Sequence, residues 1–151
     1  MKIHTLEREQ LIPHPIAKVF DFFADAGNLE TITPPWLHFH ILTPRPIKME
    51  AGALIDYSLR IRGFPIRWRT RIETWNPPFD FVDLQLRGPY QLWEHTHRFV
   101  EEGASTRMFD TVRYALPWGA LGSLAHAAMV RSDLRKIFDY RARKVAEGIG
   151  D

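Results

Sequence analysis

The order of hydrophobic patterns along the chain is the feature that most constrains its fold. Between residues 37 and 116, six strand-like segments follow one another, separated by turns that contain glycine or proline. Consecutive strands joined by short turns pair in an antiparallel sheet. Residues 120–147 then repeat apolar side chains every three to four positions, which is typical of a long helix with one buried face. The sequence therefore predicts an antiparallel sheet with a long C-terminal helix packed on its concave side.

The N-terminal part of the chain supplies the remaining elements. Residues 2–12 alternate loosely and predict a first strand. A short helix is expected over 15–24, and a second one over 25–33 ends at two consecutive prolines. The helical spacing of the first is carried by Ile16, Val19, Phe20 and Phe23. The six later strands are expected at 37–43, 52–62, 65–75, 79–87, 90–101 and 105–116.

Length and composition narrow the class of protein. The 151 residues contain no linker or repeat, so we expect a single domain over 1–151. Cysteine is absent, which excludes disulfides, thiolate metal sites and cysteine nucleophiles. The chain starts with a strand-like pattern instead of a signal peptide, and charges interrupt every apolar run. We therefore expect a cytoplasmic protein with no integral membrane association.

Strand pairing on either side of Gly63 separates an inner from an outer face. A turn at residues 63–64 places Leu59 opposite Trp68, with Tyr57 on the same apolar face. The other face then carries Asp56 opposite Arg71. One apolar and one charged face indicate that the faces are assigned correctly, because a slip of one residue would exchange them.

A second hairpin places imidazoles beside a carboxylate. A turn centred on residues 102–103 sets His95 opposite Asp110 and His97 opposite Met108, whereas a slip of two sets His97 opposite Asp110. In either register, an inward carboxylate lies beside an inward imidazole. Three roles stay open for His95, His97 and Asp110: a structural pair that holds two strands together, a polar anchor for a ligand, or a general base.

Aromatic side chains dominate the rest of the expected inner face. Tyr57, Trp68, Trp93 and Tyr114, with Met108, either line a cavity for a planar or acyl ligand or pack as core. Their density favours a cavity beside the histidines. These five residues, together with His95, His97 and Asp110, are the predicted ligand-binding set.

The strand expected at 79–87 is assigned by its apolar residues. Val82, Leu84 and Leu86 alternate and are expected to face inward. Asp83 lies between them and is expected to face outward.

Two His-x-His pairs raise the question of a metal. His38 and His40 share one strand face, as do His95 and His97. A metal site needs a suitable number and geometry of ligands, and spacing assigns no third ligand to either pair. We therefore predict neither a metal nor a cofactor.

Arginine is concentrated in one hairpin. The outward face carries Arg60, Arg62, Arg67, Arg69 and Arg71. Such a face either attracts an acidic partner, anionic lipid headgroups or nucleic acid, or is a solvated surface paired in part by Asp56 and Glu73. No aromatic residues interleave with it on that face, and the net charge is +2, so no nucleic-acid partner is predicted.

Arg141 lies in line with the buried stripe of the last helix. We expect its side chain to reach out to solvent, and an inward Arg141 would suggest an acidic ligand group. Residues 118–122 contain two glycines and predict either a mobile pocket rim or a tight turn.

The C-terminal half also carries motifs of a known superfamily. From His95 to Arg141 it reads H-x-H-x-F, then G-x-x-T-x-M-x-D-x-V-x-Y-x-x-P, then I-F-x-Y-R. With Phe20, Phe23 and Gly52, this resembles the ligand-binding, cyclase/dehydrase-like branch of the SRPBCC superfamily (START, Bet v 1 and polyketide cyclase relatives). The resemblance implies an α+β helix-grip fold. In that fold a curved antiparallel β-sheet wraps around a long C-terminal α-helix, with two short helices after the first strand and a cavity between sheet and helix.

The predicted function is binding of a small, mainly hydrophobic molecule, such as a lipid, acyl chain, isoprenoid or aromatic polyketide-like compound. The alternative is a cyclase/dehydratase-type enzyme that uses the His–Asp pair, with His95, His97 and Asp110 as candidate catalytic residues. A weaker third alternative is an interaction domain that docks its arginine face on an acidic partner. A homodimer is compatible with all three. No phosphate-binding loop, dinucleotide fingerprint or nucleophile elbow is present to favour a common enzyme class.

Overall fold

The computed structural model describes residues 1–117 and 124–149, and its elements follow the expected order. The helices are α1 (Ile16–Ala24), α2 (Ala26–Ile32) and α3 (Leu124–Gly148), with a short 3₁₀ helix, η1 (Pro35–Leu37). The strands are β1 (His4–Ile12), β2 (His40–Ile41), β3 (Leu54–Ile61), β4 (Phe64–Asn76), β5 (Asp80–Arg87), β6 (Leu92–Glu102) and β7 (Ser105–Ala115).

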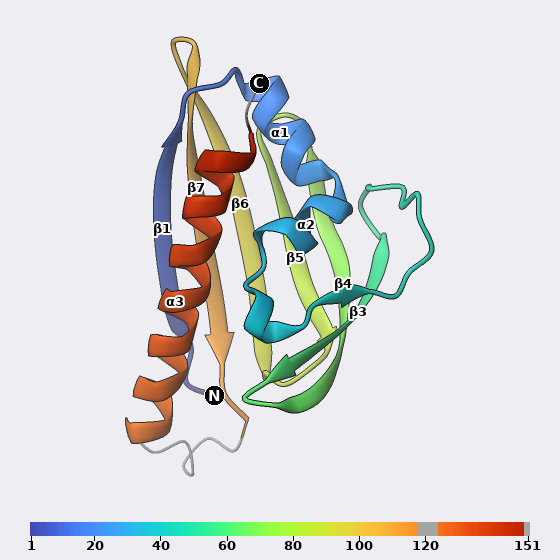
Figure 1. The fold of residues 1–151 in the computed structure, drawn as a ribbon, viewed down its shortest axis with the longest axis vertical. Helices are drawn as coiled ribbons and strands as arrows, with labels where there is room; N and C mark the ends of the chain where they lie inside the picture. Colours follow the sequence, from blue (N-terminus) through green and yellow to red (C-terminus); the bar gives the residue numbers. More distant parts are fainter. Residues whose placement is uncertain (118–123, 150–151) are drawn as a thin grey trace.

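In the part of the chain that the structure describes, seven strands form one antiparallel sheet in the order β1-β7-β6-β5-β4-β3-β2. The sheet curves around α3, which lies along β1, β7 and β6, while α1 and α2 lie over β5 and β4 (Figure 1). The predicted α+β helix-grip fold is confirmed. None of the described helices is long and apolar enough to span a bilayer.

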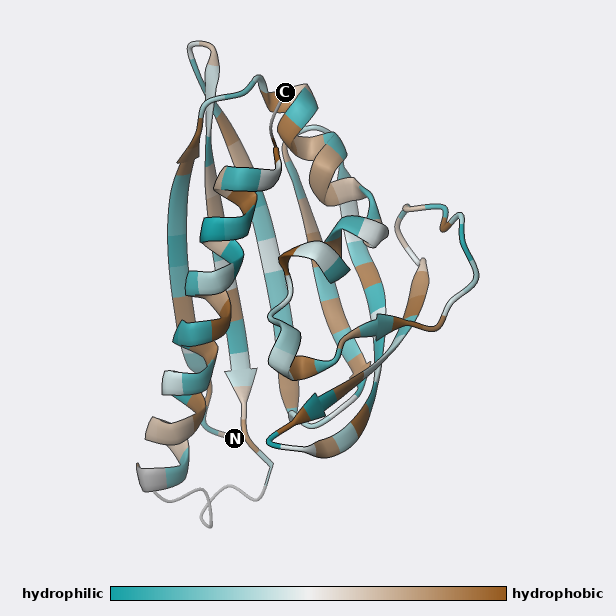
Figure 2. Ribbon diagram, viewed as in Figure 1, coloured by the Kyte–Doolittle hydropathy of each residue, from teal (hydrophilic) through white to brown (hydrophobic). Residues whose placement is uncertain are grey.

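The core follows from the alternation of the strands and the spacing of the helices. Hydrophobic and hydrophilic residues alternate along the strands (Figure 2). The apolar side of α1 packs against Phe81, Phe99 and Met108 of the sheet, whereas Leu134 and Phe138 of α3 pack against the inner face of β7. The two helical segments thus bury different parts of one inner face.

Turn geometry corrects the first hairpin register. Arg62 and Gly63 both adopt positive φ angles, 50° and 84°, which is the geometry of a two-residue hairpin turn. Tyr57 therefore pairs with Trp68, two residues away from the predicted register. The inner face is as predicted, because a shift of two leaves every side chain on its own side.

The second hairpin adopts the alternative register. His97 lies opposite Asp110, and Phe99 lies opposite Met108. The first-stated register, with His95 opposite Asp110, is therefore wrong. The turn lies one residue later than predicted, at residues 103–104, since Glu102 pairs with Ser105 around Gly103, whose φ is 62°.

Two predicted boundaries also change. The strand expected at 37–43 is reduced to β2, because prolines precede and follow it and His38 adopts a left-handed φ of 47°. Helix α3 is described from Leu124, and the predicted rim at 118–122 lies outside the described residues.

Candidate functional site

A buried polar network lies at the centre of the inner face. It consists of Asp83 from β5, His95 and His97 from β6, Asp110 from β7 and Arg141 from α3. His95 and His97 are two positions apart on one strand, so both face inward. Asp83 is paired with His95 on one side, and Asp110 with His97 on the other. The strand registers thus surround the two imidazoles with two carboxylates.

Each imidazole bonds the carboxylate that lies diagonally from it. His95 Nε2 is 2.7 Å from Asp110 Oδ1, and His97 Nε2 is 2.7 Å from Asp83 Oδ2. The rings of His95 and His97 stack with centroids 3.7 Å apart, and Phe81 stacks on the other side of His97 at 4.0 Å. Packing on both faces therefore fixes the orientation of His97.

Arg141 closes the network from the helix side. Its Nη2 lies 3.5 Å from Asp110 Oδ1 and 3.4 Å from His97 Nδ1, and the residue is only 9% exposed. The expectation that Arg141 reaches out to solvent is wrong. The side chain turns inward because the buried carboxylate of Asp110 attracts the guanidinium.

The contacts assign the proton on His97. A guanidinium only donates, so His97 Nδ1 accepts from Arg141, and Nε2 carries the proton that it donates to Asp83. Burial and the neighbouring His95 lower the pKa of His97 to about 4. His97 is therefore neutral near pH 7, in agreement with this tautomer.

Both carboxyl groups are ionised despite their burial. Burial acts to raise the pKa of Asp83, but the hydrogen bond from His97 and nearby positive charge lower it overall. Burial likewise opposes ionisation of Asp110, and the charge of Arg141 and the hydrogen bond with His95 hold its pKa well below the usual range. The network thus holds two carboxylates and one guanidinium.

The orientation of Asp83 contradicts the sequence-based expectation. On β5 the inward residues are Phe81 and Asp83, not Val82 and Leu84. Register shifts between Arg69 and Thr70 and between Ile72 and Thr74 interrupt the pairing of β4 with β5. The alternation was correct, but the set with Asp83 and Phe81 lies inside, where His97 gives the carboxylate of Asp83 a partner and the core takes up Phe81.

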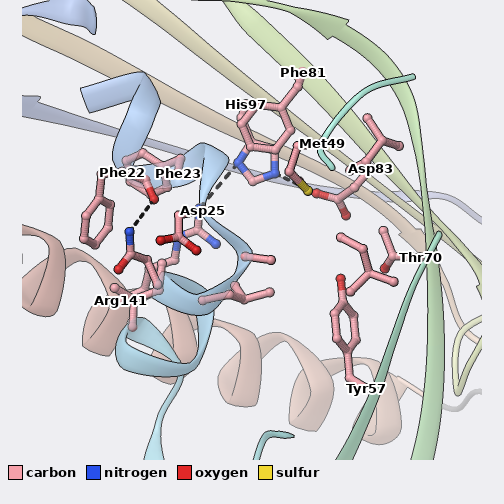
Figure 3. A pocket seen from close by; sticks show the side chains of 16 residues that line it. Phe22, Phe23, Asp25, Met49, Tyr57, Thr70, Phe81, Asp83, His97 and Arg141 are labelled. Carbon is pink, nitrogen blue, oxygen red and sulfur yellow. Dashed lines mark hydrogen bonds and ion pairs between the residues drawn. The ribbon is translucent and has the colours of Figure 1, made fainter. Parts of the chain in front are cut away.

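A cavity of about 50 Å³ borders the network (Figure 3). Asp83, His97 and Arg141 form its polar wall, and Tyr57 and Thr70 line it as well. The other lining residues come mainly from α1, α2, β3 and β4: Phe22, Phe23, Asp25, Ala26, Asn28, Leu29, Ile32, Met49, Ile55, Ile72 and Phe81. The result is a mostly apolar space with one charged, hydrogen-bonded wall.

The predicted ligand-binding residues divide into three groups: those that line the cavity, those that belong only to the polar network, and those that pack elsewhere in the core. Tyr57 and His97 line the cavity. His95 and Asp110 belong to the network but do not line this cavity.

The remaining predicted residues lie elsewhere in the core. Met108 packs with α1. Trp68, Trp93 and Tyr114 form an aromatic cluster with Tyr90, in which ring centroids are 4.8–6.4 Å apart. The cavity lies on the α1–α2 side of the network, away from the predicted place beside Trp93.

Sequence reasoning missed Asp83 and misplaced Arg141. The available signal for Asp83 was a single carboxylate in the middle of the apolar run of β5. Such a residue in a strand covered on one side needs a partner if it faces inward. No local pattern shows that two histidines of the next strand supply that partner.

Three residues could hold a metal ion. Among the described residues, Asp83, His95 and His97 offer ligand atoms that all lie within 4.8 Å of one another, and His38 and His40 are not part of this cluster. Carboxylate and imidazole suit several divalent metals. However, the proton of His97 Nε2 already serves Asp83, and Arg141 places a positive charge beside the same imidazole. The network is therefore held together by hydrogen bonds and ion pairs among its own residues.

Apart from Arg62 in the turn, the arginines of the hairpin lie on the opposite, outer face. Arg69 forms an ion pair with Asp56 and Arg71 with Glu73, while Arg62 reaches Asp133 on α3 at 2.9 Å. These arginines therefore find carboxylates within the protein itself.

Solved structures share this fold at low sequence identity. The Zhui aromatase/cyclase from Streptomyces sp. R1128 superposes with a TM-score of 0.78 and 16% identity, over 98% of this chain and 94% of that chain. Ara h 8.0201 gives 0.68 and 15%, over 97% and 100%. The nucleoside-diphosphate sugar epimerase from Corynebacterium glutamicum gives 0.72 and 25%, over 94% of this chain but 28% of the epimerase.

The family assignment rests on a sequence match. None of the curated proteins searched matches the chain. The family described as polyketide cyclase/dehydrase and lipid transport matches residues 12–140, which is most of the sequence. That match agrees with the superfamily resemblance of the motifs between His95 and Arg141 and with the helix-grip fold. The chain therefore belongs to the polyketide cyclase/dehydrase and lipid transport family, within the SRPBCC superfamily.

Proposed function

We propose that this protein binds a small, mainly apolar molecule in the cavity between the sheet, α1–α2 and α3. The observation that carries the proposal is the cavity itself, whose lining is mostly apolar and whose buried charged and imidazole groups, Asp83, His97 and Arg141, lie together on one side. Small-molecule sites in proteins have this composition, with a few placed polar groups that orient the ligand. Lipid, acyl, isoprenoid and aromatic polyketide-like molecules all fit this description.

The size of the cavity requires the site to open. Its volume of about 50 Å³ accommodates a few water molecules, whereas ligand pockets usually measure roughly 300–1,000 Å³. Asp25, Ala26 and Asn28 line both this cavity and an open surface groove next to Arg45. The beginning of α2 is thus the wall between the cavity and the groove. We infer that a ligand enters here by displacing α2.

A pair of contacts holds this wall in place. Glu30 of α2 accepts hydrogen bonds from Arg45 Nη2 at 2.8 Å and from the backbone N–H of Ile41 at 2.9 Å. Both partners lie in or beside the segment that leads from β2 to β3. Releasing them would let α2 and this segment separate.

The relatives support the ligand class without defining it. The family description includes lipid transport, and one structural relative is an aromatase/cyclase. Both kinds of protein handle molecules with large apolar surfaces.

The test is direct detection of binding. Native mass spectrometry of the freshly purified protein should show a bound small molecule, and a neutral fluorophore such as N-phenylnaphthylamine should bind with increased emission. Ile55→Phe, which adds volume at a buried cavity wall, should abolish binding. Val112→Ile, a buried change away from the cavity lining, is the matched control. Absence of binding in the unmodified protein would refute the proposal.

A catalytic use of the same site is the second candidate. His97 lies on the cavity wall as a neutral imidazole beside the carboxylate of Asp83, and it would act as a general base for a cyclase or dehydratase if its Nδ1 exchanged the contact with Arg141 for a substrate proton. His95 and Asp110 do not line the cavity, so this version assigns the catalytic pair to His97 and Asp83. Asp83→Asn should then abolish turnover of a bound polyketide-like substrate while leaving its binding intact. Retained turnover would exclude this role.

Location and assembly remain predictions. We expect the protein in the cytoplasm, which cell fractionation would check, and a homodimer is open to sedimentation analysis. The arginine hairpin is the surface that an acidic partner would use, and binding there would weaken strongly with added salt.

A further inference from the structure

The starting observation is an unpaired donor on a residue that lines the cavity. Among the described residues, Arg141 Nε is the buried side-chain nitrogen or oxygen that lacks a hydrogen-bond partner. Arg141 lines the cavity and is 9% exposed. Buried polar groups are rarely left unpaired, and an unpaired one at a ligand site indicates a partner that arrives with the ligand.

We propose that Arg141 selects the ligand by donating from Nε to an uncharged oxygen, such as a ketone or ether oxygen, and that the site rejects carboxylates. This inference rests on the proposed function and specifies its ligand class.

The contacts of the guanidinium leave Nε without an acceptor in the part of the protein that the structure describes. The network uses Nη2, which faces Asp110 Oδ1 and His97 Nδ1 at 3.5 and 3.4 Å. The guanidinium is planar and its donors have fixed directions, so the groups that satisfy Nη2 do not satisfy Nε. Phe23 and Phe138 lie near the guanidinium, with its Cζ 5.4 and 5.6 Å from the ring centroids, and offer no oxygen acceptor.

The charges around Arg141 decide between a neutral and an anionic ligand. From the sheet, Asp110 and His97 contact Arg141 directly, while Asp83 is joined to His97 and His95 to Asp110 by hydrogen bonds. Asp25, the exposed N-cap of α2, adds a further carboxyl group at the edge of the cavity lining. A ligand carboxylate would place another negative charge among these groups at a site of low dielectric constant, which is strongly unfavourable.

The charged groups around Arg141 also reverse a prediction made from the sequence. An inward Arg141 suggested an acidic ligand, because a guanidinium binds carboxylates well. Here its charge is already shared with Asp110. What remains on Nε is a hydrogen-bond donor rather than an uncompensated charge.

Three small molecules of matched shape test the proposal. Acetophenone carries a neutral carbonyl, α-methylstyrene has the same shape with a methylene group in place of the oxygen, and benzoate is charged. Dissociation constants are measured by NMR titration of the full-length protein at pH 7. We expect acetophenone to bind about tenfold more tightly than α-methylstyrene, because a hydrogen bond to a charged group is gained, and benzoate to bind more weakly than both.

Arg141→Lys is the diagnostic variant. It keeps a positive charge for Asp110 but removes the Nε donor. Its affinity for α-methylstyrene should stay within about twofold of the wild-type value, while the tenfold preference for acetophenone disappears. If the variant does not fold, the NMR resonance of the Arg141 Nε–H in the wild-type protein gives the answer. It should shift with acetophenone and not with α-methylstyrene.

The outcomes separate this inference from the proposed function. If none of the three probes and no neutral fluorophore binds, the proposed function fails. If the probes bind but benzoate equals or exceeds acetophenone, or if the two neutral probes bind equally, the proposed function stands and the role of Arg141 is overturned.

Discussion

The inner face of the sheet has two regions that the sequence treated as one pocket. On the α1–α2 side of the histidines, a cavity lies against Asp83, His97 and Arg141. On the other side, Trp68, Tyr90 and Trp93 contact one another with ring centroids 4.8–5.8 Å apart. The comparison shows that this aromatic cluster is packed core rather than a pocket wall, since its rings fill the space by contacting each other. The hollow is found instead where a buried donor lacks a partner.

The largest expected effect is loss of the central network. Asp110→Ala removes the carboxylate that His95 and Arg141 share and leaves a buried guanidinium without its charge partner. Breaking a buried pair in this way should cost about 4 kcal/mol of unfolding free energy, measured by urea denaturation. The exposed pair of Arg8 and Asp139 supplies the control, because Asp139→Ala should cost less than about 1 kcal/mol. Equal costs would mean that the network does not stabilise the fold.

The aromatic cluster should affect stability without affecting binding. Trp93→Ala removes a ring that contacts Trp68, Tyr90 and Tyr114, and should cost about 3 kcal/mol of unfolding free energy. Its affinity for acetophenone, measured where the variant is folded, should change by less than about twofold, because the cluster lies outside the cavity lining. A large loss of affinity would restore the sequence-based view that Trp93 contacts the ligand.

The cavity side should show a pH dependence that arises from His97. Its pKa falls from 6.5 to about 4 on folding, so the unfolded chain binds a proton in this window that the folded protein does not. The contribution of His97 to the free energy of unfolding is therefore fully present above pH 6.5. It is lost as the pH is lowered toward 4, by up to about 1.4 kcal/mol per pH unit. Urea denaturation of wild type and His97→Gln between these pH values should show a smaller slope for the variant. Identical slopes would remove His97 as the cause.

The smallest effect is expected at the proposed entrance. Arg45→Ala breaks a half-exposed ion pair with Glu30 and should change the unfolding free energy by less than about 1 kcal/mol. Because this contact holds α2 against the neighbouring segment, the variant should bind N-phenylnaphthylamine several-fold faster in stopped-flow mixing. Arg69→Ala, which breaks the ion pair with Asp56 on the outer face, should leave the association rate unchanged. A rate that responds equally to both variants would place the entrance elsewhere.

The sequence predicted the fold more completely than the site. Alternation is a local property with a period of two, so Tyr57, His95, His97 and Asp110 were assigned to the inner face correctly. The register of each hairpin was less well determined, because it depends on whether a turn residue such as Arg62 adopts a positive φ. An error of two residues in the register leaves every side chain on the same face of the sheet. It changes which residue lies opposite each side chain on the neighbouring strand.

The sequence by itself determined the order of the elements, the antiparallel sheet, the long helix and which strand positions face inward for most of the chain. Only the tertiary structure decided that Asp83 faces inward, that Arg141 turns away from solvent and that the cavity lies beside α2. The physical reason is that a charged side chain is stable in the interior only with partners, and those of Asp83 and Arg141 come from other strands. The position of a void likewise depends on how all the surrounding side chains fit together, which no single segment specifies.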